Sequence, residues 1–256
     1  MSESTPVPSR PAAGVAAIEL NRPDAANRLQ LDDLAALMTQ LDQLERDDEV
    51  QALVLMSRGR HFCAGFDLRA LLAGLQSGER DAQGDKAFEA LADRLEATRL
   101  ITIVAIQGAV VGGATDLALA CDLRLGAPAA RMQMPAANFG LPLYAGALQR
   151  YVSRLGLDHA KRLVFLAEKI DAAQMLRIGF LHEIVEEPAL RPRALELART
   201  VAALPARPLA AMKQVLNAAA LGQGTAAAQR GTLDAAFDGP AMAARIAALR
   251  PPRDDV

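Results

Sequence analysis

The chain has 256 residues, of which 52% are hydrophobic and 23% are charged, and its 28 basic and 30 acidic side chains give a formal net charge of −2. These values are typical of a globular protein with one substantial core, or of one domain with a small appendage. They exclude the basic surface of a nucleic-acid-binding protein. No apolar run reaches the roughly 18 residues of a membrane span, so we expect no membrane partner.

The two cysteines, Cys63 and Cys121, lie far apart in the sequence and outside any C-x-x-C pattern. This spacing argues against a disulfide framework and against a thiolate metal site. The three histidines are scattered without the spacing of metal ligands, so we expect no metal. The first residues are polar and rich in proline and do not resemble a signal peptide, which makes a cytoplasmic location the expectation.

In chain order, the pattern first predicts a flexible N-terminal tail over residues 1–13 and a buried strand over 14–20. A stripe of leucines then predicts a helix over 31–48. Apolar runs of strand length follow at 50–57, 101–108 and 123–128, with helical patterns between them. Strands that alternate with helices at these spacings predict an α/β fold with crossover connections.

From about residue 145 the pattern changes to amphipathic helices, interrupted by one strand-like segment, "LHEIVEE", over 181–187. The sequence therefore predicts an α/β core over residues 14–195 and a C-terminal helical region over 196–256. No internal repeat is present.

Two junctions share one design, in which a strand ends, small residues follow and a helix begins. They read "FCAGFDL", over 62–68, and "IQGAVVGGATDLALACD", over 106–122. Glycine lets the backbone approach a ligand, and the start of a helix has unpaired N–H groups. Two such N–H groups from separate loops can converge on one carbonyl oxygen and form an oxyanion hole. The alternative is that the glycines only shape turns and allow close packing of helix and strand.

The sequence resembles the crotonase, or enoyl-CoA hydratase/isomerase, superfamily. The matching stretches, in order, cover nearly all of residues 14–186 and read "NRPDAANRL", "VQALVLMSRGRHFCAGFDL", "VVGGATDLALACDLRLG", "FGLPLYAGALQR" and "DAAQMLRIGFLHEIV". The resemblance implies a crotonase-like β-β-α superhelix of the ClpP/crotonase type, followed by a helical oligomerisation region. It further implies a lyase or isomerase of fatty acid metabolism that assembles as a homotrimer or homohexamer. Its substrate is an acyl-CoA thioester, and no separate cofactor is implied.

By position, the resemblance implies that the N–H groups of Phe66 and Gly113 form the oxyanion hole and that Asp116 is the acid/base. Tyr144 lies in a loop where some family members have catalytic residues. Ala136 stands at the position of the second glutamate of the hydratases. The residues that the resemblance assigns to coenzyme A and substrate are Asp24, Ala26, Arg28, Ala64, Gly65, Asp67, Leu68, Arg69, Gly112 and Ala136.

Each of the polar candidates also has a structural interpretation. Asp116 can be a carboxylate that neighbouring donors satisfy inside the protein, and Tyr144 can be a half-buried aromatic residue with its hydroxyl at the surface. Arg28 and Arg69 can be solvated surface residues rather than phosphate ligands. Asp67 can be a helix cap.

Two functions follow from these residues. The first is an enzyme that stabilises a thioester enolate, with Asp116 as its acid/base, a single carboxylate being enough for double-bond isomerisation. The second is a catalytically weak or inactive protein that binds acyl-CoA, because Ala136 cannot supply the second acid/base group of a hydratase.

Overall fold

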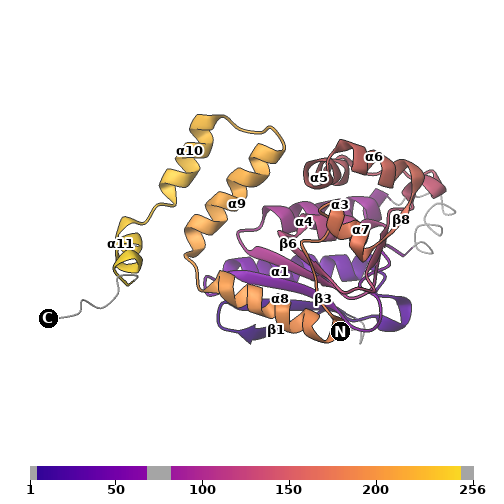
Figure 1. Ribbon diagram of the computed structural model, residues 1–256, viewed down its shortest axis with the longest axis horizontal. Helices are drawn as coiled ribbons and strands as arrows, with labels where there is room; N and C mark the ends of the chain where they lie inside the picture. Colours follow the sequence, from indigo (N-terminus) through magenta and orange to yellow (C-terminus); the bar gives the residue numbers. More distant parts are fainter. Residues whose placement is uncertain (1–4, 68–81, 249–256) are drawn as a thin grey trace. The chain divides into compact units, whose positions relative to one another are not determined.

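The computed structural model describes residues 5–67 and 82–248 of the chain (Figure 1). The chain folds into two compact units, Met1–Leu204 and Pro205–Val256. The second unit contains helices α9 (Ala206–Ala220), α10 (Ala226–Ala235) and α11 (Gly239–Ala248). None of the described helices is both long and apolar enough to cross a bilayer.

A six-stranded sheet forms the centre of the first unit. Its strands, in spatial order, are β1 (Val7–Ala12), β2 (Val15–Leu20), β3 (Ala52–Ser57), β4 (Ile101–Ile106), β6 (Leu123–Gly126) and β9 (Glu183–Ile184). Within this sheet, neighbouring strands from β2 through β3, β4 and β6 to β9 pair in parallel, and only β1 is antiparallel to its neighbour. The predicted α/β fold with crossover connections is confirmed.

Strand β1 lies within the segment for which the sequence predicts a flexible tail. It pairs with β2 at the edge of the sheet, and five of its six residues are exposed. Pro8 and Pro11 fit there because an edge strand can leave one side of its backbone unpaired. Exposed residues and prolines are therefore typical both of a tail and of an edge strand, and part of the segment predicted as a tail is a strand.

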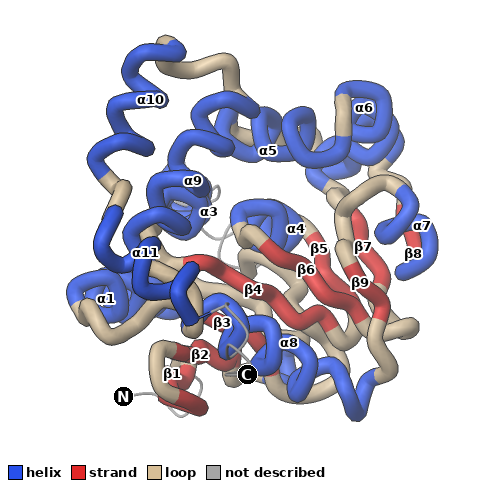
Figure 2. Tube along the Cα trace, turned by 60° about the vertical axis from the view of Figure 1, so that its left-hand side comes forward, coloured by secondary structure: helices blue, strands red, loops and turns tan. Residues whose placement is uncertain are grey.

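Helices cover both faces of the sheet (Figure 2). On one face, Leu53 and Leu55 of β3 belong to a large apolar cluster with helices α1 (Leu31–Arg46), α3 (Ala82–Ala97) and α4 (Gly113–Ala120). On the other face, Val54 packs in a smaller cluster with helix α8 (Glu187–Ala202). Because both faces are buried, the strands are almost continuously apolar.

A second, three-stranded sheet contains β5 (Ala109–Val111), β7 (Arg131–Gln133) and β8 (Lys169–Asp171). Strand β5 follows β4, and β7 follows β6, so successive turns of the chain place one strand in each sheet. Helices α5 (Ala145–Leu155), α6 (Leu157–Leu166) and α7 (Ala172–Arg177) complete this unit, with short 3-10 turns at Pro23–Ala25 and Ala136–Phe139. The loops that enter the second sheet carry the candidate site.

Candidate active site

The two loops singled out in the sequence meet beside the three-stranded sheet. Cys63 forms a parallel β-bridge with Val110, and the Val111 N–H donates to the carbonyl oxygen of Cys63 at 2.9 Å. Gly65 lies so close to the second loop that a Cβ there would be 2.6 Å from the Val111 carbonyl oxygen and 3.2 Å from the Gly113 nitrogen. Its φ of +83° also favours glycine. This close approach of the loops therefore requires glycine at position 65.

The backbone N–H groups of Phe66 and Gly113 have no hydrogen-bond partner within residues 5–67 and 82–248. Leu29 and Phe66 form a parallel β-bridge, in which the Leu29 N–H donates to the Gly65 carbonyl oxygen and the Asp67 N–H donates to the Leu29 carbonyl oxygen. In this geometry the Phe66 N–H points away from Leu29. Gly113 is the first residue of α4, where an N–H has no acceptor within the helix. We call these two groups the backbone pair.

Phe66 and Gly113, the two residues of the backbone pair, both line one cavity of about 370 Å³. Most of its other walls are apolar and include Phe88, Met134 and Leu141. Ala136, which is 7% exposed, also lines it and contributes only a methyl group. None of the described residues that line this cavity is an aspartate, glutamate, lysine or arginine. The cavity is therefore suited to an uncharged, apolar group.

Asp116 lies on α4 one turn after Gly113, is fully buried and does not line the cavity. Its Oδ1 accepts a hydrogen bond from Arg150 Nε at 2.8 Å. Its Oδ2 accepts one from Arg150 Nη2 at 2.8 Å and one from the Tyr144 hydroxyl at 2.6 Å. Both carboxylate oxygens are thus engaged, and the Arg150 pair is bidentate. Tyr144 lines the cavity and links Asp116 to it.

Arg150 joins this carboxylate to helix α3. Its Nη1 lies 2.7 Å from Asp93 Oδ1 and 3.1 Å from Glu96 Oε2, and Arg154 Nη2 lies 2.6 Å from Glu96 Oε1. We call this group, with Asp116 and Tyr144, the Arg150 network. Burial acts to lower the pKa of Arg150, but its hydrogen bonds and attraction to the carboxylates outweigh burial, and its pKa lies above the ordinary value. Arg150 is therefore a permanent cation in the interior.

Tyr144 retains its proton strongly. Burial of the phenol raises its pKa well above the ordinary value, and the negative charge of Asp116 and the hydrogen bond to it raise it further. The N-cap position of α5 directs this side chain towards α4. The hydroxyl acts as the donor, since the bidentate Arg150 pair holds Asp116 as an acceptor.

The segment to which the resemblance assigns the coenzyme A arm runs beside the first loop. The Ala64 N–H donates to the Ala26 carbonyl oxygen at 2.9 Å, and Asp24 is exposed in the neighbouring 3-10 turn. Arg28 is paired with Asp67, its Nε lying 2.8 Å from Oδ2. The remaining two candidates, Leu68 and Arg69, lie outside the described residues.

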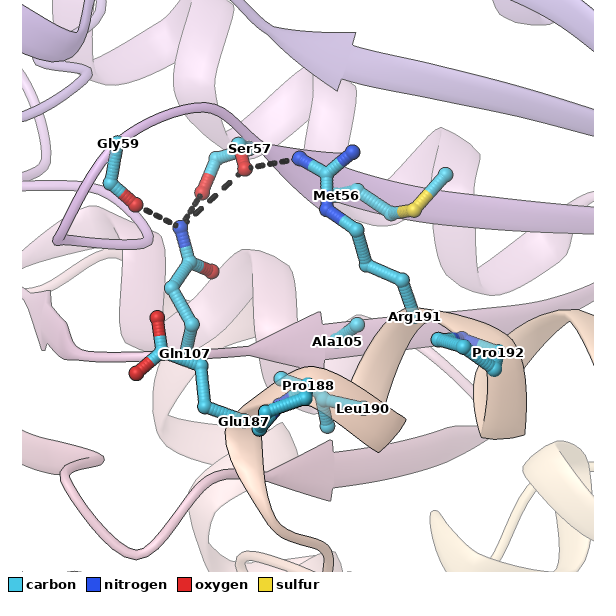
Figure 3. A pocket seen from close by; sticks show the side chains of 10 residues that line it. All are labelled: Met56, Ser57, Gly59, Ala105, Gln107, Glu187, Pro188, Leu190, Arg191 and Pro192. Carbon is cyan, nitrogen blue, oxygen red and sulfur yellow. Dashed lines mark hydrogen bonds between the residues drawn. The ribbon is translucent and has the colours of Figure 1, made fainter.

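A second cavity, of about 520 Å³, lies between α8 and the ends of β3 and β4 (Figure 3). Gln107 Nε2 donates to Ser57 Oγ at 2.8 Å and to the Gly59 carbonyl oxygen at 3.0 Å. Arg191 Nη2 donates to the Ser57 carbonyl oxygen at 2.7 Å. These polar side chains bond to the end of β3 and to the loop after it, so they have a structural role. The cavity that Phe66 and Gly113 line is therefore the better candidate for the active site. Within the described residues, no cluster of three or more His, Cys, Asp or Glu side chains could hold a metal ion.

Neither Arg150 nor Phe88 is among the residues that the sequence predicts for the site. Phe88 packs so closely on Gly113 that a Cβ at Gly113 would be 2.8 Å from its ring. A signal for Arg150 was present, because the stripe Ala147, Tyr151 and Leu155 places position 150 on the buried side of α5. An arginine on a buried face needs an anion, and Asp116 needs a cation.

Comparisons with known proteins agree with this geometry. The sequence model of the enoyl-CoA hydratase/isomerase family matches residues 10–236. A short-chain-enoyl-CoA hydratase of Clostridium acetobutylicum is 31% identical over 206 residues, which are 79% of this chain and 77% of that protein. The 1,2-epoxyphenylacetyl-CoA isomerase of Escherichia coli is 30% identical over 208 residues, 80% of this chain and 79% of that one.

A solved structure has the same fold. The crystal structure of an enoyl-CoA hydratase from Bacillus anthracis superposes with a TM-score of 0.84 at 25% identity, over 93% of this chain and 91% of that one. The chain therefore belongs to the enoyl-CoA hydratase/isomerase family, a family of enzymes, and has the crotonase fold that its sequence predicts.

Proposed function

We propose that the chain binds an acyl-CoA with the thioester oxygen between the N–H groups of Phe66 and Gly113, which stabilise an enolate. The observation that carries this proposal is the backbone pair itself, two donors from separate loops at one cavity that have no partner among the described residues. Such donors stabilise negative charge as it develops, without reorganising. In this proposal, Asp24, Ala26, Arg28 and residues 64–69 contact the coenzyme A moiety of the substrate, and no further cofactor is needed.

The acyl group that fits this cavity is uncharged and apolar, because the walls are aromatic and aliphatic. We propose Asp116 as the acid/base for the enolate. With Ala136 in the second position, isomerisation of a double bond suits the site better than hydration, since one carboxylate can take and return a single proton. Assembly as a trimer or hexamer, a cytoplasmic location and a role in fatty acid metabolism belong to the same proposal.

The experiment uses 4-dimethylaminocinnamoyl-CoA, whose absorption moves to longer wavelength when its carbonyl oxygen is polarised. Gly113→Pro removes the N–H and retains a residue that is favoured at the first position of a helix. Gly113→Ala is the matched control, because both variants place a Cβ against Phe88 and only proline lacks the donor.

We expect the bound thioester to show the long-wavelength band with the wild type and with Gly113→Ala, and to lose it with Gly113→Pro. Turnover should fall by about 10²–10³-fold in the proline variant. A band that persists in Gly113→Pro contradicts the role of the backbone pair, as does failure of the wild type to bind the thioester.

A catalytically weak acyl-CoA-binding protein is the second candidate. It is favoured by the engagement of both oxygens of Asp116 and by the absence of a carboxylate from the described residues that line the cavity. A panel of enoyl-CoA substrates followed by mass spectrometry distinguishes the two. Tight binding without product supports the binding protein, and turnover of any member supports the enzyme.

A further inference from the structure

Tyr144 is the residue through which the cavity and Asp116 are connected. Asp116 is fully buried behind the cavity wall, whereas Tyr144 lines the cavity and its hydroxyl lies 2.6 Å from Asp116 Oδ2. The Tyr144 oxygen therefore lies between the cavity and this carboxylate, and a proton that moves from a ligand in the cavity to Asp116 can pass through it. The phenol oxygen has lone pairs beyond the one donor bond that it makes.

Two side chains, Arg150 and Tyr144, hold the carboxylate of Asp116. Arg150 approaches it with two nitrogens, each at 2.8 Å, and is itself 1% exposed. A guanidinium in this bidentate geometry stabilises the charged form of the carboxylate. Tyr144 faces the second oxygen and adds a further donor.

The other groups near this pair come from α3, α4 and α5. Asp93 and Glu96 of α3 share the Arg150 guanidinium, and Arg154 pairs with Glu96. The hydroxyl of Tyr151 is 2.6 Å from the hydroxyl of Thr115 and forms a separate hydrogen bond beside the network. Arg150 is thus the cation in direct contact with Asp116, and its removal leaves a buried carboxylate without a counter-charge.

We propose, on the basis of the function proposed above, that Tyr144 is a catalytic proton relay between the acyl chain and Asp116, and that Arg150 is a positioning residue that holds the Asp116 carboxylate in place. In this step the α C–H bond breaks and its electron pair enters the enolate, whose oxygen is held by the backbone pair. The released proton goes to the Tyr144 oxygen as the phenol proton goes to Asp116 Oδ2. The reverse transfer returns a proton to the α carbon or to the γ carbon of an enolate conjugated with a double bond.

The test follows the exchange of the α protons of hexanoyl-CoA with D₂O by mass spectrometry. We expect the wild type to incorporate deuterium and Tyr144→Phe to do so about 10²–10⁴-fold more slowly, since loss of a positioned acid/base group has this effect. Calorimetric binding of hexanoyl-CoA should be unchanged, because phenylalanine keeps the ring. Tyr151→Phe is the matched control, as it removes a neighbouring buried hydroxyl that does not contact Asp116.

The role of Arg150 is tested by the same exchange in two variants. Arg150→Gln removes the cation and the bidentate contact that holds Asp116, so the exchange rate should fall by roughly 10²-fold. Arg150→Lys keeps a positive charge and should restore much of the exchange rate. Calorimetric binding of hexanoyl-CoA should be unchanged in both variants, which loss of the folded site does not predict.

The results separate this inference from the proposed function. If the wild type neither binds hexanoyl-CoA nor shifts the absorption of the chromophoric thioester, the proposed function fails. If it binds and polarises the thioester but exchanges no α proton, or if Tyr144→Phe exchanges at the wild-type rate, the relay is wrong. A wild-type exchange rate in Arg150→Gln overturns the positioning role.

Discussion

The backbone pair and the Arg150 network meet at the first turn of α4, and they treat polar groups in opposite ways. In the backbone pair, the N–H groups of Phe66 and Gly113 have no partner among the described residues. In the network, both oxygens of Asp116 and all three guanidinium nitrogens of Arg150 are engaged. The difference lies in the surroundings, because Phe66 and Gly113 line a cavity, whereas Asp116 and Arg150 are buried.

This contrast shows how a short segment can supply both a binding site and its support. A neutral N–H at a helix start can remain unpaired at a modest cost where a ligand or water can reach it. A buried charge without a partner costs far more, so the carboxylate behind the site must be neutralised by the protein. Four predictions test the contrast, beginning with the network.

Arg150→Met removes the cation from the network. We expect a loss of about 3–5 kcal/mol in the free energy of unfolding, because Asp116 is left buried without a counter-charge. Urea denaturation measures this loss. Arg162→Met is the control, since Arg162 is 60% exposed and pairs only at the surface with Glu168, where a pair contributes roughly 0–1 kcal/mol. Equal losses in the two variants contradict the view that the network holds a buried charge.

Gly65→Ala tests the approach of the two loops. We expect a loss of about 1–3 kcal/mol in stability, because the new Cβ meets the Val111 carbonyl oxygen, together with loss of acyl-CoA binding in calorimetry. Gly140→Ala is matched in backbone strain, with φ of +64°, but its Cβ meets nothing within 4 Å. If both variants bind acyl-CoA like the wild type, the close contact is not needed for the backbone pair.

Ala136→Glu restores a carboxylate to the wall of the cavity. We expect hydration of crotonyl-CoA to rise by about tenfold or more, because a second acid/base group contributes at this position in a two-carboxylate mechanism. Initial rates measured by loss of the enoyl absorbance provide the test. Ala137→Glu is the control, since Ala137 is exposed and does not line the cavity. A similar rate in both variants indicates that the site lacks more than this carboxylate.

We expect the smallest effect from His182, because this residue lies at the surface. Partial removal of its ring from water, with the positive charge of Arg124, lowers its pKa from 6.5 to about 4. Between these pH values the unfolded chain binds a proton that the folded chain does not, so stability should fall as the pH drops from about 6.5 to about 4. Urea midpoints measured across this range, with His182→Gln as the comparison, test it. Identical pH dependence in the two proteins contradicts the assignment.

Local patterns in the sequence were sufficient to predict much of the fold and the two loops. Strands and helices have periods that a short window reveals, and Gly65, Gly112 and Gly113 mark places where the backbone comes close to another group. The strands over 14–20 and 50–57 and the helix over 31–48 match β2, β3 and α1 within a few residues. The edge strand β1 did not have this signal, because its prolines and exposed residues look the same in a tail.

The environment of Asp116 shows what lies beyond such patterns. The sequence indicates a carboxylate one helical turn after two glycines, and the stripe of α5 places an arginine on a buried face. Their pairing joins residues 34 positions apart, and it forms only because α4 and α5 pack together. Local periodicity therefore specifies which residues face the interior. The pairing of buried charges depends on packing between elements that are distant in the sequence. In this molecule that packing places Phe66 and Gly113 at a cavity and buries the Asp116 carboxylate against Arg150.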